Sequence, residues 1–161
     1  MWMVLFVKDL SGIRVPDRTY DPELEDVGSI LTDICRELEY GLEFVVSGFG
    51  QDRWPVDVSV DLAIILEQFP EIFCAIREGT QLNIDFYEQG VERYIKLTPD
   101  KEYYVAECTS ISKWQPNPNV ERIHRSNLEK MLLDIKETFI SVLEKVAPNL
   151  LRHIWIQKWM G

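Results

Sequence analysis

The stretch from Gln81 to Ile111 constrains the fold of this chain more than any other. Apolar and polar residues alternate there in three runs, separated by Gln89-Gly90 and by Thr98-Pro99-Asp100. Alternation with a period of two places apolar side chains on one face of a strand, and turn residues between such runs indicate antiparallel neighbours. The sequence therefore predicts a three-stranded antiparallel meander.

The register of the first hairpin follows from a two-residue turn at Gln89-Gly90, because glycine tolerates the positive φ that such a turn needs. Apolar residues then fall opposite apolar residues, as the correct register requires, since directly opposed side chains share one face of a sheet. The predicted pairs are Phe86 with Arg93, Ile84 with Ile95 and Leu82 with Leu97.

The second connection allows two loop lengths. A five-residue loop, Thr98 to Glu102, sets Leu97 opposite Tyr103 and Ile95 opposite Val105. A four-residue loop places Glu92 directly across from Glu107, a destabilising pair of like charges. We therefore favour the five-residue loop. The core face then carries Leu82, Ile84, Phe86, Ile95, Leu97 and Val105, and the outer face carries Asp85, Tyr87, Glu92, Tyr94 and Tyr104.

The N-terminal half supplies shorter elements. The run from Trp2 to Val7 is wholly apolar, which predicts a strand buried on both faces. Apolar residues spaced by three and four from Leu24 to Leu38 predict a helix with Asp21 as its cap. Leu42 to Gly50 predicts a strand followed by a glycine-rich bend, and the short alternation from Val56 to Val60 predicts another strand.

Helical patterns dominate elsewhere. Asp61 to Glu78 is apolar all round, which indicates burial between layers, and Pro70 predicts a break into two helices. Ser126 and Glu129 form a capping-box pattern before an apolar stripe that should pack on the core face of the meander. Leu150 to Met160 predicts a last helix. The chain is therefore expected to be an α+β protein: an antiparallel meander packed against a capped C-terminal helix and additional N-terminal and central helices.

Composition limits the partners. With 161 residues, 46% of them hydrophobic, the chain is expected to form one globular domain, residues 1–161. Its net charge of −10 argues against a nucleic-acid or anionic-membrane ligand, which needs a basic surface, and suits a basic protein partner. The apolar N-terminus is too short for a membrane span and lacks a basic leader and a cleavage site, so a cytoplasmic location is expected.

No chemical motif identifies an enzyme. The three cysteines are scattered, and the two histidines stand at no metal-binding spacing, so we predict neither a metal site nor a cofactor. No nucleophile elbow accompanies the histidines, and we predict no catalytic residues. An enzyme or small-ligand binder with a pocket between sheet and helices remains the alternative.

The outer face of the meander is the best candidate for partner binding. Tyrosine offers apolar area, a polar tip and few rotamers to freeze, so Asp85, Tyr87, Glu92, Tyr94 and Tyr104 are the predicted contact residues. The alternative is that the first helix covers this face and the tyrosines are packing residues. Trp54, Trp155 and Trp159 form a second candidate interface, although a tryptophan stripe is more often core.

Three segments carry a family resemblance: SGFGQDRWPVDV leading into DLAIILEQFPEIF, the strand pair IDFYEQGVER, and SKWQPNP before the final capped helix. In their arrangement and in overall composition, the chain resembles the small acidic bacterial immunity proteins of polymorphic toxin systems. The resemblance implies stoichiometric binding to the active face of a cognate toxin, with no catalytic residues.

Overall fold

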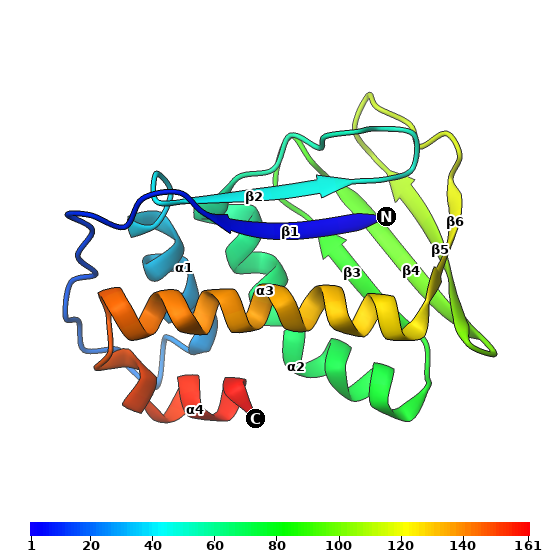
Figure 1. Cartoon of the computed structure of the whole chain (residues 1–161). Coiled ribbons are helices and arrows are strands. Elements are labelled where there is room, and N and C mark those ends of the chain that lie inside the picture. The colour runs from blue at the N-terminus through cyan, green and yellow to red at the C-terminus, as the bar shows by residue number, and fades with distance from the viewer.

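The computed structural model describes residues 1–161 as two antiparallel sheets with helices packed on them (Figure 1). In chain order the elements are β1 (Trp2–Val7), α1 (Val27–Glu37), β2 (Leu42–Ser47), the π-helical turn η1 (Val58–Leu62), α2 (Ala63–Glu78), β3 (Leu82–Phe86), β4 (Arg93–Asp100), β5 (Tyr103–Ser110), β6 (Val120–His124), α3 (Arg125–Val146), the 3₁₀ turn η2 (Leu150–Arg152) and α4 (Ile154–Met160). The predicted α+β class is confirmed.

The four-stranded sheet has the order β3-β4-β5-β6, and β1 pairs with β2 in a separate two-stranded ribbon. The predicted register of the first hairpin is confirmed, because Leu82, Ile84 and Phe86 pair with Leu97, Ile95 and Arg93. The predicted meander gains a fourth strand, β6, from the segment before the last long helix.

The predicted register of the second hairpin is wrong. Leu97 is opposite Ala106 instead of Tyr103, so the strand is displaced by three residues. An odd displacement reverses the faces of a strand. Tyr104 is therefore in the core and only 1% exposed, and Val105 is on the outer face. β4 continues through Pro99. Because β3 begins opposite Leu97, no residue of β3 lies opposite Pro99, and none needs the N–H that proline lacks.

The turn that closes this hairpin contains only Lys101 and Glu102, and Lys101 adopts φ 56°. A lysine is an unusual residue at positive φ, and no glycine marks this position. This is why the sequence suggested a longer loop.

The helices enclose one core shared by both sheets. α3 lies along β1 and reaches the four-stranded sheet at β6, while α2 lies against β3 (Figure 1). The predicted apolar stripe of α3 is buried at Leu128, Leu132, Ile135, Phe139 and Val142. Its main packing surface is β1, where the sequence led us to expect the meander.

Two predicted helix starts are corrected. His124, not Ser126, is the N-cap of α3, and its ring nitrogen accepts a hydrogen bond from the Ser126 N–H. α1 begins at Val27 with Asp26 as its N-cap, so Leu24 precedes the helix and is 84% exposed. The predicted strand from Val56 to Val60 is also wrong, because the chain enters η1 at Val58.

Pro70 does not break α2, contrary to the prediction. A residue at position 70 of a regular helix would donate its N–H to the carbonyl of Leu66, and proline has no N–H to donate. The indole Nε1–H of Trp159 donates to this carbonyl instead, at 2.6 Å in the buried interior. The C-terminal helix therefore satisfies the acceptor that the proline leaves free.

The hydrogen bond from Trp159 to the Leu66 carbonyl should contribute to stability. Trp159→Phe keeps an aromatic ring against Phe69 and Phe139 but leaves the buried Leu66 carbonyl without a donor. We expect the free energy of unfolding to fall by about 1–3 kcal/mol, the usual cost of an unsatisfied buried polar group, measured by urea denaturation. The control is Trp155→Phe, because the half-buried Trp155 packs on Tyr20 without an indole hydrogen bond. Equal losses in the two variants would contradict the role given to Trp159.

β1 is a strand as predicted, but only one of its faces is buried. Met3 and Leu5 point into the core, whereas Trp2 is 49% exposed and Phe6 is 47% exposed. Helices cover only one side of this two-stranded ribbon, so the entirely apolar β1 leaves the side chains of its other face in solvent.

Candidate protein-binding site

Two of the predicted contact residues, Asp85 and Tyr87, lie in a groove where α2 passes the outer edge of β3. β3 is the terminal strand of its sheet, so this edge has no neighbouring strand. The groove has a volume of about 370 Å³, and Tyr87 is 51% exposed. The lining residues are Gln68, Glu71, Ile72, Ala75, Gln81, Leu82, Asn83, Asp85 and Tyr87.

The Gln68 side chain closes part of the strand edge. Its Oε1 accepts a hydrogen bond from the Asp85 N–H, and its Nε2 donates to the Asp85 carbonyl, both at 2.9 Å. These two bonds reproduce the pair that a neighbouring antiparallel strand would make. The backbone of Asn83, two residues earlier, points in the same direction and opens into the groove.

Carboxylates surround Tyr87 without counter-ions. Glu67 and Glu71 are one helical turn apart on α2, Asp85 is on β3, and Glu88 follows in the turn. None of the four is within 4.0 Å of a basic side chain, although other acidic residues of the chain do form ion pairs. Glu71, Asp85 and Tyr87 line the groove, and the charges of Glu67 and Glu88 act on Tyr87 from its margin. We call these five residues the acidic groove.

Burial is the main cause of raised pKa values at three residues of the acidic groove, and neighbouring negative charge adds to it at two of them. Burial and the neighbouring Asp26 raise the pKa of Glu67, and burial raises the pKa of Asp85. The pKa of Tyr87 is raised by burial and then by the charges of Glu67 and Glu88. A cation brought into the groove would reverse the effect of the neighbouring charges, so the site favours a positively charged ligand.

Two further predicted contact residues, Tyr94 and Glu92, lie beside this groove. Tyr94 is directly opposite Asp85 on the outer face of the sheet and is half-buried. Glu92 is half-buried in the preceding turn, where it adopts φ 45°. α1 packs on η1, α2 and α4, so the alternative in which the first helix covers the meander's outer face is wrong.

Tyr104 is not available to a partner. The reversed face of β5 turns its side chain inward, and its hydroxyl donates to the Thr80 carbonyl at 3.1 Å. Two tryptophans of the second candidate interface are also in the core: Trp54 is 2% exposed and Trp159 is 3% exposed. Trp155 is half-buried between Tyr20 and His153. The core alternative for the tryptophan stripe therefore holds at Trp159.

Trp54 helps to enclose the guanidinium of Arg93, which points into the core from β4. The Arg93 guanidinium carbon is 4.2 Å from the ring centroid of Trp54 and 3.7 Å from that of Trp114. No acid pairs with it, and its Nε and Nη1 have no hydrogen-bond partner. Burial lowers the pKa of Arg93. The two indole faces supply the attraction that a carboxylate would otherwise supply.

Sequence reasoning missed Glu67, Glu71 and Glu88. The four-residue spacing of Glu67 and Glu71 signalled that they share a helix face. Their proximity to Tyr87 depends on α2 passing β3, which no local pattern encodes.

Comparisons with protein-family models, curated proteins and solved structures find no match to this chain. No three His, Cys, Asp or Glu side chains gather in a geometry that could hold a metal ion. None of the helices combines the length and apolarity needed to cross a bilayer.

Proposed function

We propose that this chain is a protein-binding module whose acidic groove receives a basic segment of its partner. The observation that carries the proposal is the set of four carboxylates around the exposed Tyr87, none of them paired with a basic side chain. Like charges gathered on one surface repel one another, and a partner that supplies lysine or arginine relieves this repulsion on binding.

The groove also provides the contacts that determine how long a complex lasts. Tyr87 supplies apolar area at the centre of the charges, and the free backbone groups of Asn83 supply hydrogen-bond donors and acceptors. Tyrosine is frequent among residues that dominate binding energy. The surrounding acids steer a basic partner towards this point, because complementary potentials increase the rate of encounter.

The finer form of the proposal follows from the resemblance described above. The partner would be the toxic domain of a polymorphic toxin, and this chain would neutralise it by stoichiometric binding. A net charge of −10 is compatible with a basic toxin surface. A large modular toxin gene immediately upstream of the gene for this chain would support the immunity function, and its purified toxic domain would be the partner to test.

Tyr87→Ala should mainly accelerate dissociation of the complex, on the order of tenfold to a hundredfold, because loss of a central aromatic contact acts on the off-rate. Surface plasmon resonance with the purified partner measures the rate constants. Tyr40→Ala is the matched control, since Tyr40 is 84% exposed and lines a different hollow, which shares no residue with the acidic groove. Unchanged dissociation of Tyr87→Ala would place the interface elsewhere.

A further inference from the structure

The outer face of the β1–β2 ribbon is an exposed apolar surface that the acidic groove does not use. Trp2, Val4 and Phe6 alternate along this face of β1, and Val45 is directly opposite Val4. The two aromatic side chains are each about half exposed, at 49% and 47%. Contiguous patches of exposed apolar side chains often mark association surfaces. We call Trp2, Val4, Phe6 and Val45 the ribbon face.

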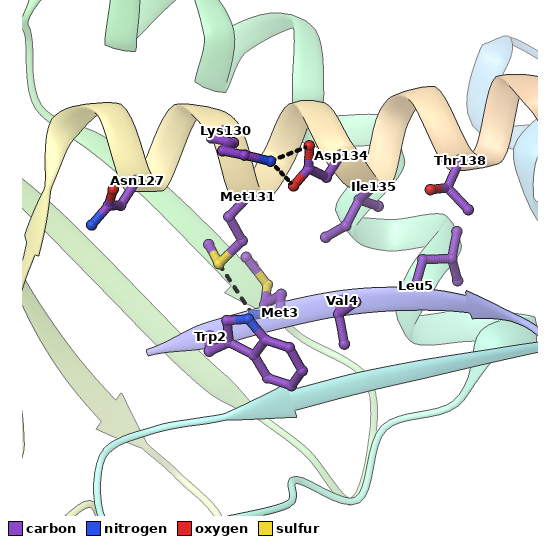
Figure 2. A pocket seen from close by; sticks show the side chains of 10 residues that line it. All are labelled: Trp2, Met3, Val4, Leu5, Asn127, Lys130, Met131, Asp134, Ile135 and Thr138. Carbon is purple, nitrogen blue, oxygen red and sulfur yellow. Dashed lines mark hydrogen bonds and ion pairs between the residues drawn. The ribbon is translucent and has the colours of Figure 1, made fainter.

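A hollow of about 370 Å³ lies between one end of this face and α3 (Figure 2). Trp2 and Val4 form one side of the hollow, and Lys130, Asp134 and Thr138 of α3 form the other. The Met3 N–H donates to Met131 Sδ at 3.1 Å, so α3 closes the edge of β1 at this point. An added strand therefore cannot pair with β1 here, and association must use the face.

The acidic side chains that border the ribbon face are paired with basic ones. Glu43, which is opposite Phe6, pairs with Arg53 at 2.6 Å, and Lys130 pairs with Asp134 at 2.6 Å. This balance contrasts with the net charge of −10 and with the unpaired acids of the groove. A basic partner gains nothing from a balanced surface. A second copy of this acidic chain, however, meets the least repulsion where no unpaired negative charges face each other.

We propose that the ribbon face is the interface of a symmetric dimer of this chain. A two-fold axis through Val4 brings the two Val4 side chains together and sets Phe6 of each copy over Trp2 of the other. Phe6 of each copy then covers the hollow beside Trp2 of the other copy, because a two-fold interface repeats every contact. The acidic groove remains free for a different partner, so this dimer does not depend on the proposed function.

The test uses sedimentation equilibrium of the full chain and of charge variants at the axis. Wild type should show a monomer–dimer equilibrium at micromolar to millimolar concentration. Val4→Glu and Val4→Lys should each raise the dimer dissociation constant by on the order of a hundredfold, since like charges then meet at the axis. An equimolar mixture of the two variants should recover dimer, because Glu and Lys now face each other. This recovery also shows that both variants are folded.

Leu24→Glu is the matched control, because Leu24 is 84% exposed in the loop before α1 and should tolerate the charge without a change in dimer affinity. Wild type that remains monomeric across this range would overturn the proposal. Dimers that persist in Val4→Glu, or dissociate equally in Leu24→Glu, would also overturn it. So would a monomer that binds a different protein through Trp2 and Phe6.

Discussion

Replacing Phe139 with alanine should lower the free energy of unfolding by about 3–5 kcal/mol, the range typical of a core phenylalanine. Phe139 is fully buried in the middle of the α3 stripe, and its ring meets Trp159 edge to face at 5.9 Å between centroids. Deleting it removes apolar burial and leaves a cavity between the long helix and α4. The neighbouring residues can fill this cavity only in part, because helices hold them from several sides.

Urea denaturation of purified protein measures this loss. Leu133→Ala on the same helix is the control, because Leu133 is 37% exposed and its truncation should cost less than about 1 kcal/mol. A cost below 1 kcal/mol for Phe139→Ala would mean that the α3 stripe does not form the centre of the core.

Asp61→Asn should stabilise the protein at neutral pH by up to about 3 kcal/mol, the equivalent of a shift of roughly two pKa units. Asp61 is only 2% exposed, and burial raises its pKa to about 6. One carboxylate oxygen accepts the Asp57 N–H at 2.9 Å, while Oδ1 has no partner. An asparagine keeps the first contact and removes the buried negative charge.

The raised pKa of Asp61 makes the stability of the protein depend on pH. The folded pKa of Asp61 lies above the value of about 4 expected for the unfolded chain, so the folded state binds the proton more tightly. This contribution to stability is present below about pH 4 and is lost as pH rises to about 6. The advantage of Asp61→Asn over wild type should therefore be small near pH 4 and reach a plateau above pH 6.

Urea denaturation across this pH range measures the difference between the variant and wild type. Asp52→Asn, at an exposed position in the same segment, is the control. A stability difference for Asp61→Asn that is independent of pH would contradict the buried, proton-binding carboxyl.

The sequence predicted the elements whose partners are local. Gln89-Gly90 joins adjacent strands, so the polarity of Ile84 and Ile95 was enough to fix their pairing. The α3 stripe was likewise predicted from the spacing of its own residues, of which Phe139 is one. Period and turn chemistry carry this information without knowledge of distant contacts.

Other features were predicted wrongly, two of them because they depend on distant segments. α2 continues through Pro70 because Trp159, far along the chain, donates to the Leu66 carbonyl. The side chains of Trp2 and Phe6 are exposed because β1 joins a two-stranded ribbon instead of the larger sheet. Tyr104 faces the core because its hairpin closes through the two-residue turn Lys101-Glu102, where no glycine marks the positive-φ position. This last determinant is local but carries no sequence signal, whereas the first two lie far along the chain from the residues they affect.

The candidate site was predicted in part. Alternation placed Asp85, Tyr87 and Tyr94 together on or beside the outer face of β3 and β4, and the structure agrees. Glu67 and Glu71 join Tyr87 only through the packing of α2 on β3. The acidic groove therefore depends on tertiary packing, and the strand pattern predicted only Asp85 and Tyr87 among its residues.

If the proposed function holds, charge at the acidic groove, and not net charge alone, should recruit the partner. The triple variant Glu67→Gln, Glu71→Gln, Glu88→Gln and the control Glu23→Gln, Glu129→Gln, Glu144→Gln lose the same three exposed negative charges. Stopped-flow association with the purified partner, measured from low to high salt, should be slowed on the order of tenfold at low salt by the groove variant. Its salt dependence should flatten, while the control stays close to wild type. Equal slowing by both triples, or no effect of either, would contradict recruitment through the acidic groove.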